Sequence, residues 1–171
     1  DAFAEEIYPR TRTSNATSIA GRYYLPYRAA LHGSYRYYID SWGIEAHTGE
    51  IGYTHPWKND WIFSVTARYY TQEQADFYAD LFPFENAQNF LARDKEMSTF
   101  DNTTLSLGIV REIDNIKWGM FEKGTINLIW DFQRYEYENF RDATDTTSPL
   151  GQERLFGFDA NVVRFFVSLW F

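Results

Sequence analysis

Alternation of apolar and polar side chains, repeated along most of the chain, is the feature that most constrains its fold. Successive side chains of a β-strand point to opposite faces, so a repeat of two residues indicates a strand with one apolar face. Little of the chain shows the 3.6-residue period of a helix. The final segment is the clearest example, with an uninterrupted apolar set at Val163, Phe165, Val167, Leu169 and Phe171. The pattern predicts seven strands, at residues 16–25, 29–40, 44–54, 61–71, 99–111, 123–137 and 155–171.

The connections between these strands alternate in length. They are short around Pro26, residues 55–60 and Asp114-Asn115, and long at residues 72–98 and 138–154. Outer-membrane barrels have short periplasmic turns at one end and long external loops at the other. We therefore expect a single domain over residues 1–171, with 72–98 and 138–154 as external loops.

Alternation alone does not distinguish a membrane barrel from a soluble barrel or sandwich, whose apolar face turns inward onto a core. Two further features favour the membrane. The predicted strands run to about 10–17 residues, against a usual length of about 5–6. Aromatic residues form 20% of the chain and gather near strand ends, where interfacial girdles would lie. The prediction is an all-β, transmembrane, antiparallel up-and-down β-barrel of the bacterial outer membrane, in contact with outer-membrane lipid and lipopolysaccharide.

The end of the chain resembles the C-terminal signal by which the barrel-assembly machinery recognises outer-membrane barrels. Arg164 and Phe171 match its polar and terminal aromatic positions. Phe166 replaces its glycine and Leu169 its other aromatic residue, so the match is partial. The resemblance implies an assembly signal carried by Arg164, Leu169 and Phe171.

Composition excludes several other classes. The formal net charge of −8 argues against a nucleic-acid partner, which would need a basic face. The chain has no cysteine, which removes disulfides, thiolate catalysis and cysteine-ligated zinc. It has no apolar run of 18 residues, as a membrane-spanning helix would require.

The predicted orientation of the strands bears on whether seven strands form a whole barrel. If Phe171 lies at the periplasmic rim, residues 1–15 fall on the external side, whereas a complete bacterial barrel has an even number of strands and begins in the periplasm. Seven strands therefore suggest the C-terminal portion of a larger barrel. The alternative is an eighth strand in residues 3–12. The first residues contain no secretion leader, so we expect a leader to have been removed or the chain to be a piece of something longer.

Several motifs resemble a known family. They are Tyr8–Arg12, Tyr35–Ile44, His47–Glu50, Arg68–Tyr70 and Ala75–Tyr78. Together they resemble domain-of-unknown-function family 3570, which is described as predicted outer-membrane β-barrels of Gram-negative bacteria. The resemblance implies that these motifs lie in the C-terminal half of much longer proteins. It implies no activity, because the family has no established one.

Some charged residues occupy the strand positions that alternate with the apolar ones, and these positions are expected to face the barrel lumen. They are Arg22, Arg36, Asp40, Glu50, Arg68, Asp131 and Arg164. One interpretation is structural, because buried charges are paired and arginine–carboxylate pairs tie strands together. The other is a water-filled pore whose charges set solute preference. The leading functional hypothesis is a passive pore for small solutes. The alternative is a scaffold barrel that holds an envelope or cell-surface protein complex.

An enzyme is a distant third hypothesis, and we expect none. A hydrolase would need a nucleophile and a base, for which His32 with Ser34 or Ser64 is the only candidate set of suitable parity. No spacing supports it. The sequence shows no metal-ligand cluster and predicts no cofactor.

The segment 72–98 is acidic but also rich in apolar side chains. Its acidic residues could bind a divalent cation, although a solvated acidic loop is the simpler interpretation. We expect the loop to pack on itself, to fold over the lumen, or to dock an envelope protein. The candidate partner surface consists of Phe77, Tyr78, Phe82, Phe84 and Phe90.

Overall fold

The computed structural model describes residues 5–84, 87–118 and 121–171, except the side chains of 115–118. It confirms an all-β fold of seven antiparallel strands joined up and down in a single sheet, each pairing with its neighbours in sequence. The strands are β1 (Ser14–Tyr24), β2 (Ala30–Asp40), β3 (Glu45–Trp57), β4 (Trp61–Gln72), β5 (Phe100–Trp118), β6 (Phe121–Arg141) and β7 (Leu155–Trp170).

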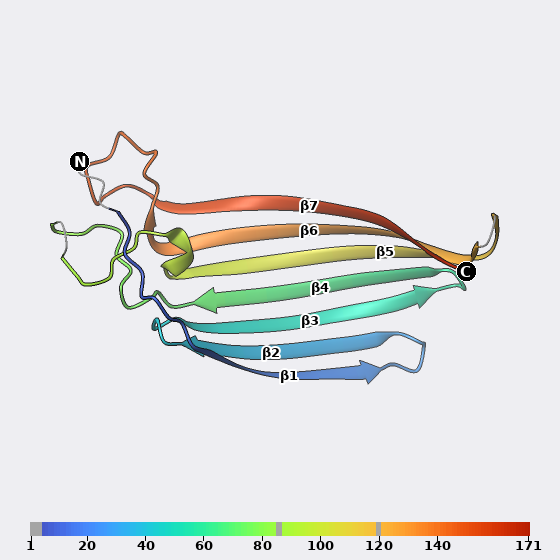
Figure 1. Cartoon of the computed structure of the whole chain (residues 1–171). Coiled ribbons are helices and arrows are strands. Elements are labelled where there is room, and N and C mark those ends of the chain that lie inside the picture. Colours follow the sequence, from blue (N-terminus) through green and yellow to red (C-terminus); the bar gives the residue numbers. More distant parts are fainter. Residues whose placement is uncertain (1–4, 85–86, 119–120) are drawn as a thin grey trace.

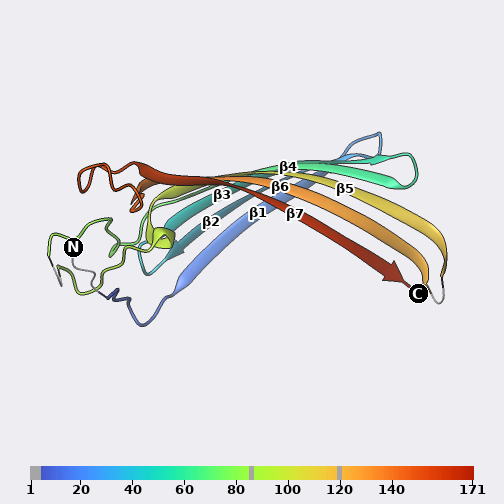
Figure 2. The same ribbon diagram turned by 90° about the horizontal axis from the view of Figure 1, so that it is seen from above.

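The sheet is strongly curved and open. Figure 1 shows the strands side by side, with the segments 73–84, 87–99 and 142–154 at one end and the C-terminus at the other. Figure 2 shows the sheet arching along the strand direction. β1 and β7 form its two edges and do not pair with each other. The described chain is therefore a partial barrel.

Helix is almost absent from the described residues. One 3-10 turn, η1 (Lys95–Met97), is capped by the side chain of Asp94, which accepts a hydrogen bond from the backbone of Glu96. No helix in this part of the chain is both long and apolar enough to cross a membrane.

The sequence-based boundaries are wrong at the β5–β6 hairpin. A turn was expected at Asp114-Asn115, but Ile113 pairs with Gly124 and Asp114 with Lys123, so the ladder continues past that point. β6 likewise runs to Arg141, and the following loop is shorter than predicted. Turn-forming residues are tolerated inside a strand when a neighbouring strand satisfies their backbone groups.

Register places the apolar and polar side chains on opposite faces, because directly paired residues share a face. One row across the sheet, from β2 to β7, is apolar: Leu31, Tyr53, Val65, Leu107, Trp130 and Val163. The adjacent row on the other face is mostly polar: His32, Gly52, Thr66, Ser106, Asp131 and Val162.

The polar face lies on the concave side of the sheet. A Cβ atom built on Gly52 would collide with the His32 ring, and one on Gly108 with the Ser64 side chain. On the apolar face, Gly21 and Gly49 have no atom within 4 Å of that position. Curvature brings side chains together on the concave face and spreads them apart on the convex face. We call the two surfaces the concave face and the convex face.

The hydrophobic cluster of the described residues lies at the loop end, not under the sheet. The segment after β4 packs on itself and against strand ends. Its buried members are Ile44, Ala75, Phe77, Tyr78, Ala92 and Met97, with Tyr8, Tyr38, Trp42 and Phe140 packed around them. We call this group the end cluster. The described part of the loop 72–98 thus packs through its own apolar residues against the ends of neighbouring strands.

Candidate functional site

The seven charged residues singled out in the sequence share the concave face. Arg22 lies level with Asp131 across the sheet, and Glu50 is directly paired with Arg68. The other members, Arg36, Asp40 and Arg164, have the same parity on their strands. Strand pairing thus gathers charges from six strands, all but β5, onto one surface.

Asp131 and Arg164 form an ion pair between β6 and the edge strand β7. Arg164 donates to Oδ2 of Asp131 at 2.7 Å, and the Asp131 side chain is 7% exposed. The two residues lie on neighbouring strands, two positions apart in register. A carboxylate so buried is stabilised by a charged partner.

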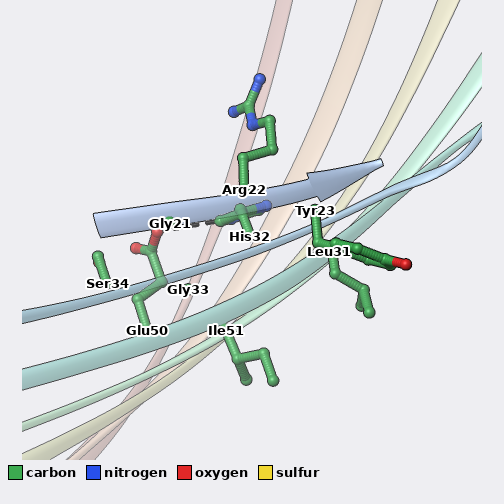
Figure 3. Close-up of a pocket in the computed structure, with 9 residues that line it drawn as sticks. All are labelled: Gly21, Arg22, Tyr23, Leu31, His32, Gly33, Ser34, Glu50 and Ile51. Carbon is green, nitrogen blue, oxygen red and sulfur yellow. Dashed lines mark ion pairs between the residues drawn. The ribbon is translucent and has the colours of Figure 1, made fainter. Parts of the chain in front are cut away.

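His32 and Glu50 lie near the edge strand β1. His32 Nε2 is 3.6 Å from Glu50 Oε1, a contact drawn as a dashed line in Figure 3. The same figure shows Arg22 extending away from this pair, while Leu31 and Ile51 extend to the opposite side of the sheet. Among the described residues, Ser34 makes no hydrogen bond to His32, so the nucleophile–base contact of a hydrolase is not formed there.

Arg36 and Arg68 stack over tyrosine rings. The Arg36 guanidinium carbon is 5.7 Å from the ring centroid of Tyr38, and that of Arg68 is 5.6 Å from Tyr70. Arg68 also donates to the side-chain oxygen of Asn102 at 3.3 Å. These contacts orient both guanidinium groups without neutralising them.

Asp40 has a structural role at the end of β2. It accepts hydrogen bonds from Arg12 at 2.8 Å, from the Tyr38 hydroxyl at 2.9 Å and from the Trp42 backbone at 2.8 Å. The Arg12 guanidinium in turn lies over the Trp42 ring, 4.6 Å from its centroid. The β2–β3 turn is thereby tied to the N-terminal segment. Sequence reasoning missed Arg12 as the partner, because the contact spans 28 positions.

The convex face carries an apolar band that crosses the sheet obliquely. On β2 the apolar set runs from Leu31 to Ile39 and is centred on Tyr35, which lies level with Asp159 of β7. The apolar set of β7 is centred on Val167, eight residues further along. Five strand spacings of about 4.8 Å carry the band about 24 Å sideways, while eight residues at about 3.3 Å carry it about 26 Å along the strands. The strands are therefore tilted by about 45° to the band, the tilt of membrane-spanning strands.

Polar side chains border the band at both ends. Toward the loop end, Arg134 and Asp159 form a two-pronged ion pair at 2.9 and 3.0 Å. Toward the turn end, Arg111 lies 3.1 Å from Asp60, with its guanidinium carbon 4.9 Å from the Trp61 centroid. The limits of the band are thus marked by paired charges, with an aromatic ring at the turn end.

Comparison with known proteins gives one match. A family described as "Protein of unknown function (DUF3570)" matches residues 1–139. The chain belongs to this family. No curated protein and no solved structure matches it. The family match confirms the resemblance carried by the motifs, and in this DUF3570 chain it extends over β1 to β5 and most of β6.

The three residues of the expected assembly signal divide between the faces. Arg164 lies on the concave face in the ion pair with Asp131, whereas Leu169 lies on the convex face. Phe171 follows β7 and is 88% exposed. Both apolar residues therefore extend the convex band to the end of β7.

The expected partner surface in the loop 72–98 is only partly available. Phe77 and Tyr78 are buried in the end cluster, Phe82 is half-buried, and Phe84 and Phe90 are exposed. The Tyr78 hydroxyl donates to the backbone oxygen of Asn139 at 3.0 Å, and burial raises the pKa of this phenol above its usual range. Two of the five residues thus hold the loop to β6 rather than facing outward.

A charged clamp fixes the same loop. The Asp80 carboxylate accepts hydrogen bonds from Arg93 Nε at 3.1 Å and from Arg141 at 3.3 Å, and the Arg93 guanidinium lies over the Phe140 ring. The clamp joins the loop to the end of β6. Within the described residues, no group of three or more His, Cys, Asp or Glu side chains could hold a metal ion.

Proposed function

We propose that this chain is part of a β-barrel in the outer membrane of a Gram-negative bacterium, and that the barrel is a passive pore for small solutes. The observation that carries the proposal is the oblique apolar band on the convex face. Large exposed apolar side chains crowd this surface, among them Ile51 at 63%, Val163 at 67% and Phe165 at 66% exposure. A contiguous apolar surface of this extent needs a non-aqueous neighbour, and hydrocarbon is one.

The distribution of side chains favours lipid over a protein core. In a soluble barrel the apolar side chains fill the interior, which is the concave side. Here the concave side carries the charged and polar residues. A polar interior with an apolar exterior is the arrangement of membrane barrels with a water-filled lumen.

The open edges of the sheet set a condition on this proposal. In hydrocarbon each unpaired backbone group costs several kcal/mol, so β1 and β7 must both pair with further strands. The number of those strands determines the width of the lumen. The barrel would contact lipid and lipopolysaccharide through the convex band, and the residues Arg164, Leu169 and Phe171 would serve the assembly machinery.

The test is conductance of the full-length protein, purified folded from its native membrane and reconstituted in planar lipid bilayers. A pore is expected to give stable, uniform openings. A folded protein that inserts into the bilayer and gives no openings would contradict the pore.

A scaffold is a second candidate, favoured by the end cluster. The loop that packs in this cluster also carries exposed apolar side chains, with Leu81 at 48%, Phe84 at 67% and Phe90 at 41%. A scaffold would bind an envelope protein through these residues. Chemical cross-linking in cells is expected to capture one defined partner, and Phe84→Ser with Phe90→Ser to abolish the capture without affecting the folded barrel.

A further inference from the structure

We infer that the concave face prefers anions, so that the solutes admitted are small anions such as inorganic phosphate and short carboxylates. This inference rests on the proposed pore and names its solute class. It follows from which charges on the concave face are already paired and which are not.

Two carboxylates of the concave face are paired with arginines, and a third, Glu50, lies beside the ring of His32. Asp131 is paired with Arg164 at 2.7 Å, and Asp40 with Arg12. Oε1 of Glu50 lies 3.6 Å from Nε2 of His32. The Asp131–Arg164 and Asp40–Arg12 pairs each balance one negative with one positive charge, so neither adds net charge to the concave face.

Three arginines are left without such a partner. Among the described residues, no carboxylate oxygen lies within 4.0 Å of the guanidinium nitrogens of Arg22, Arg36 or Arg68. Arg22 and Arg36 are exposed. A guanidinium group stays protonated at any physiological pH, so these charges are permanent.

Two of these arginines lie close together on the curved surface. Arg36 is level with Tyr70, and Arg68 is two residues from Tyr70 on the same strand. Two strand spacings and two residues separate their Cα atoms by roughly 12 Å. Tyr38 and Tyr70 orient the guanidinium groups, and Thr48 lies between them in the same row.

The balance of charge in this region is positive. Three arginines face one carboxylate, Glu50, which lies beside Arg68 in register. Toward the turn end of the same face, Glu112, Asp114 and Lys123 give a small negative excess. The chain as a whole carries −8, so its average charge would favour cations, and anion preference would arise from the sorting of charge onto this face.

The test measures reversal potentials of the full-length protein in planar bilayers under a potassium chloride gradient at low salt, where screening is weak. The double variant R36Q/R68Q removes two concave charges. The matched control R111Q/R134Q removes two arginine charges from the convex face. One unit charge about 8 Å from an ion in water enriches an anion roughly twofold and depletes a cation by a similar factor, which changes their ratio about fourfold. The double variant is therefore expected to lower the chloride-to-potassium permeability ratio by up to about sixteenfold.

Two further variants guard against loss of folding. R36K/R68K keeps the charge and is expected to keep the preference for chloride. R22Q changes an exposed residue of the edge strand and is expected to lower the ratio by up to about fourfold. Inorganic phosphate is expected to lower chloride conductance in the wild-type protein by competing for the same path.

The outcomes separate this inference from the proposed function. Chloride preference that falls in R36Q/R68Q and persists in R111Q/R134Q supports it. A permeability ratio that favours potassium, or that changes equally in both double variants, overturns the anion preference. It does not contradict the proposed pore. Absence of openings in the folded wild-type protein overturns the pore itself.

Discussion

Arg164 donates to Oδ2 of Asp131 at 2.7 Å, while Oδ1 of the same carboxylate is buried without a hydrogen-bond partner among the described residues. The pair bridges β6 and β7 on the concave face. The carboxylate therefore depends on a single charged neighbour, and the two members of the pair are not equivalent.

Replacing Arg164 is expected to cost more than replacing Asp131. Arg164→Gln leaves a buried carboxylate uncompensated and is expected to lower the free energy of unfolding by about 1–3 kcal/mol. Asp131→Asn removes the buried charge and is expected to be milder. Urea titration of the folded full-length protein measures both. Arg134→Gln, which breaks the exposed pair with Asp159, is the control and should cost about 0–1 kcal/mol.

Two adjacent residues of β6 test which face meets lipid. Leu128 lies on the convex face and is 44% exposed, whereas Asn127 lies on the concave face. Leu128→Arg would place a charge against hydrocarbon at a cost of roughly 2–4 kcal/mol and is expected to impair assembly. Asn127→Arg would extend into the polar interior and should be tolerated. Heat-modifiable migration in gels reports the folded fraction, and equal folding of both variants would contradict the assignment of the faces.

Gly43, in the β2–β3 turn, has a backbone conformation that favours glycine. Its φ is +85°, and a Cβ atom there would collide with the Asp76 carboxylate. Gly43→Ala is expected to destabilise the protein by about 1–2 kcal/mol from the left-handed backbone alone, and by more if Asp76 cannot move. Gly49→Ala is the matched control, because no atom lies within 4 Å of its Cβ position. Comparable urea midpoints for the two variants would show that the turn adapts.

The loop after β6 is expected to open in acid. Hydrogen bonds from Thr144 and the ion pair with Arg154 hold the pKa of Asp142 below its usual range. A carboxylate whose folded pKa is lowered contributes stability above its unfolded pKa, near about 3.9, and loses it as the pH falls through the folded value. Pepsin cleavage near Leu155 should therefore stay slow at pH 4.5 and accelerate toward pH 2. Asp142→Asn should be cleaved readily at both pH values, and a wild-type loop with pH-independent protection would refute this account.

Leu169 and Phe77 show which side-chain environments could be predicted from the sequence and which could not. Leu169 belongs to an alternating run, and its face followed from parity alone. Phe77 belongs to a segment with no repeat, and its burial depends on Tyr8 and Ala92, which are distant in sequence or lie across the loop. Nothing in the local pattern distinguished it from the exposed Phe84.

By itself, the sequence determined the strand count, the up-and-down order, the shared face of the seven charged residues singled out from it, and the family resemblance. Each of these follows from a two-residue period or from local motifs, which adjacent residues encode directly. Only the tertiary structure decided the oblique course of the apolar band, the extension of the β5–β6 hairpin past Asp114, the partners of Asp40 and Asp131, and the end cluster. These depend on register and on loop packing, which join residues tens of positions apart, and a shift of one residue between strands would reverse every face.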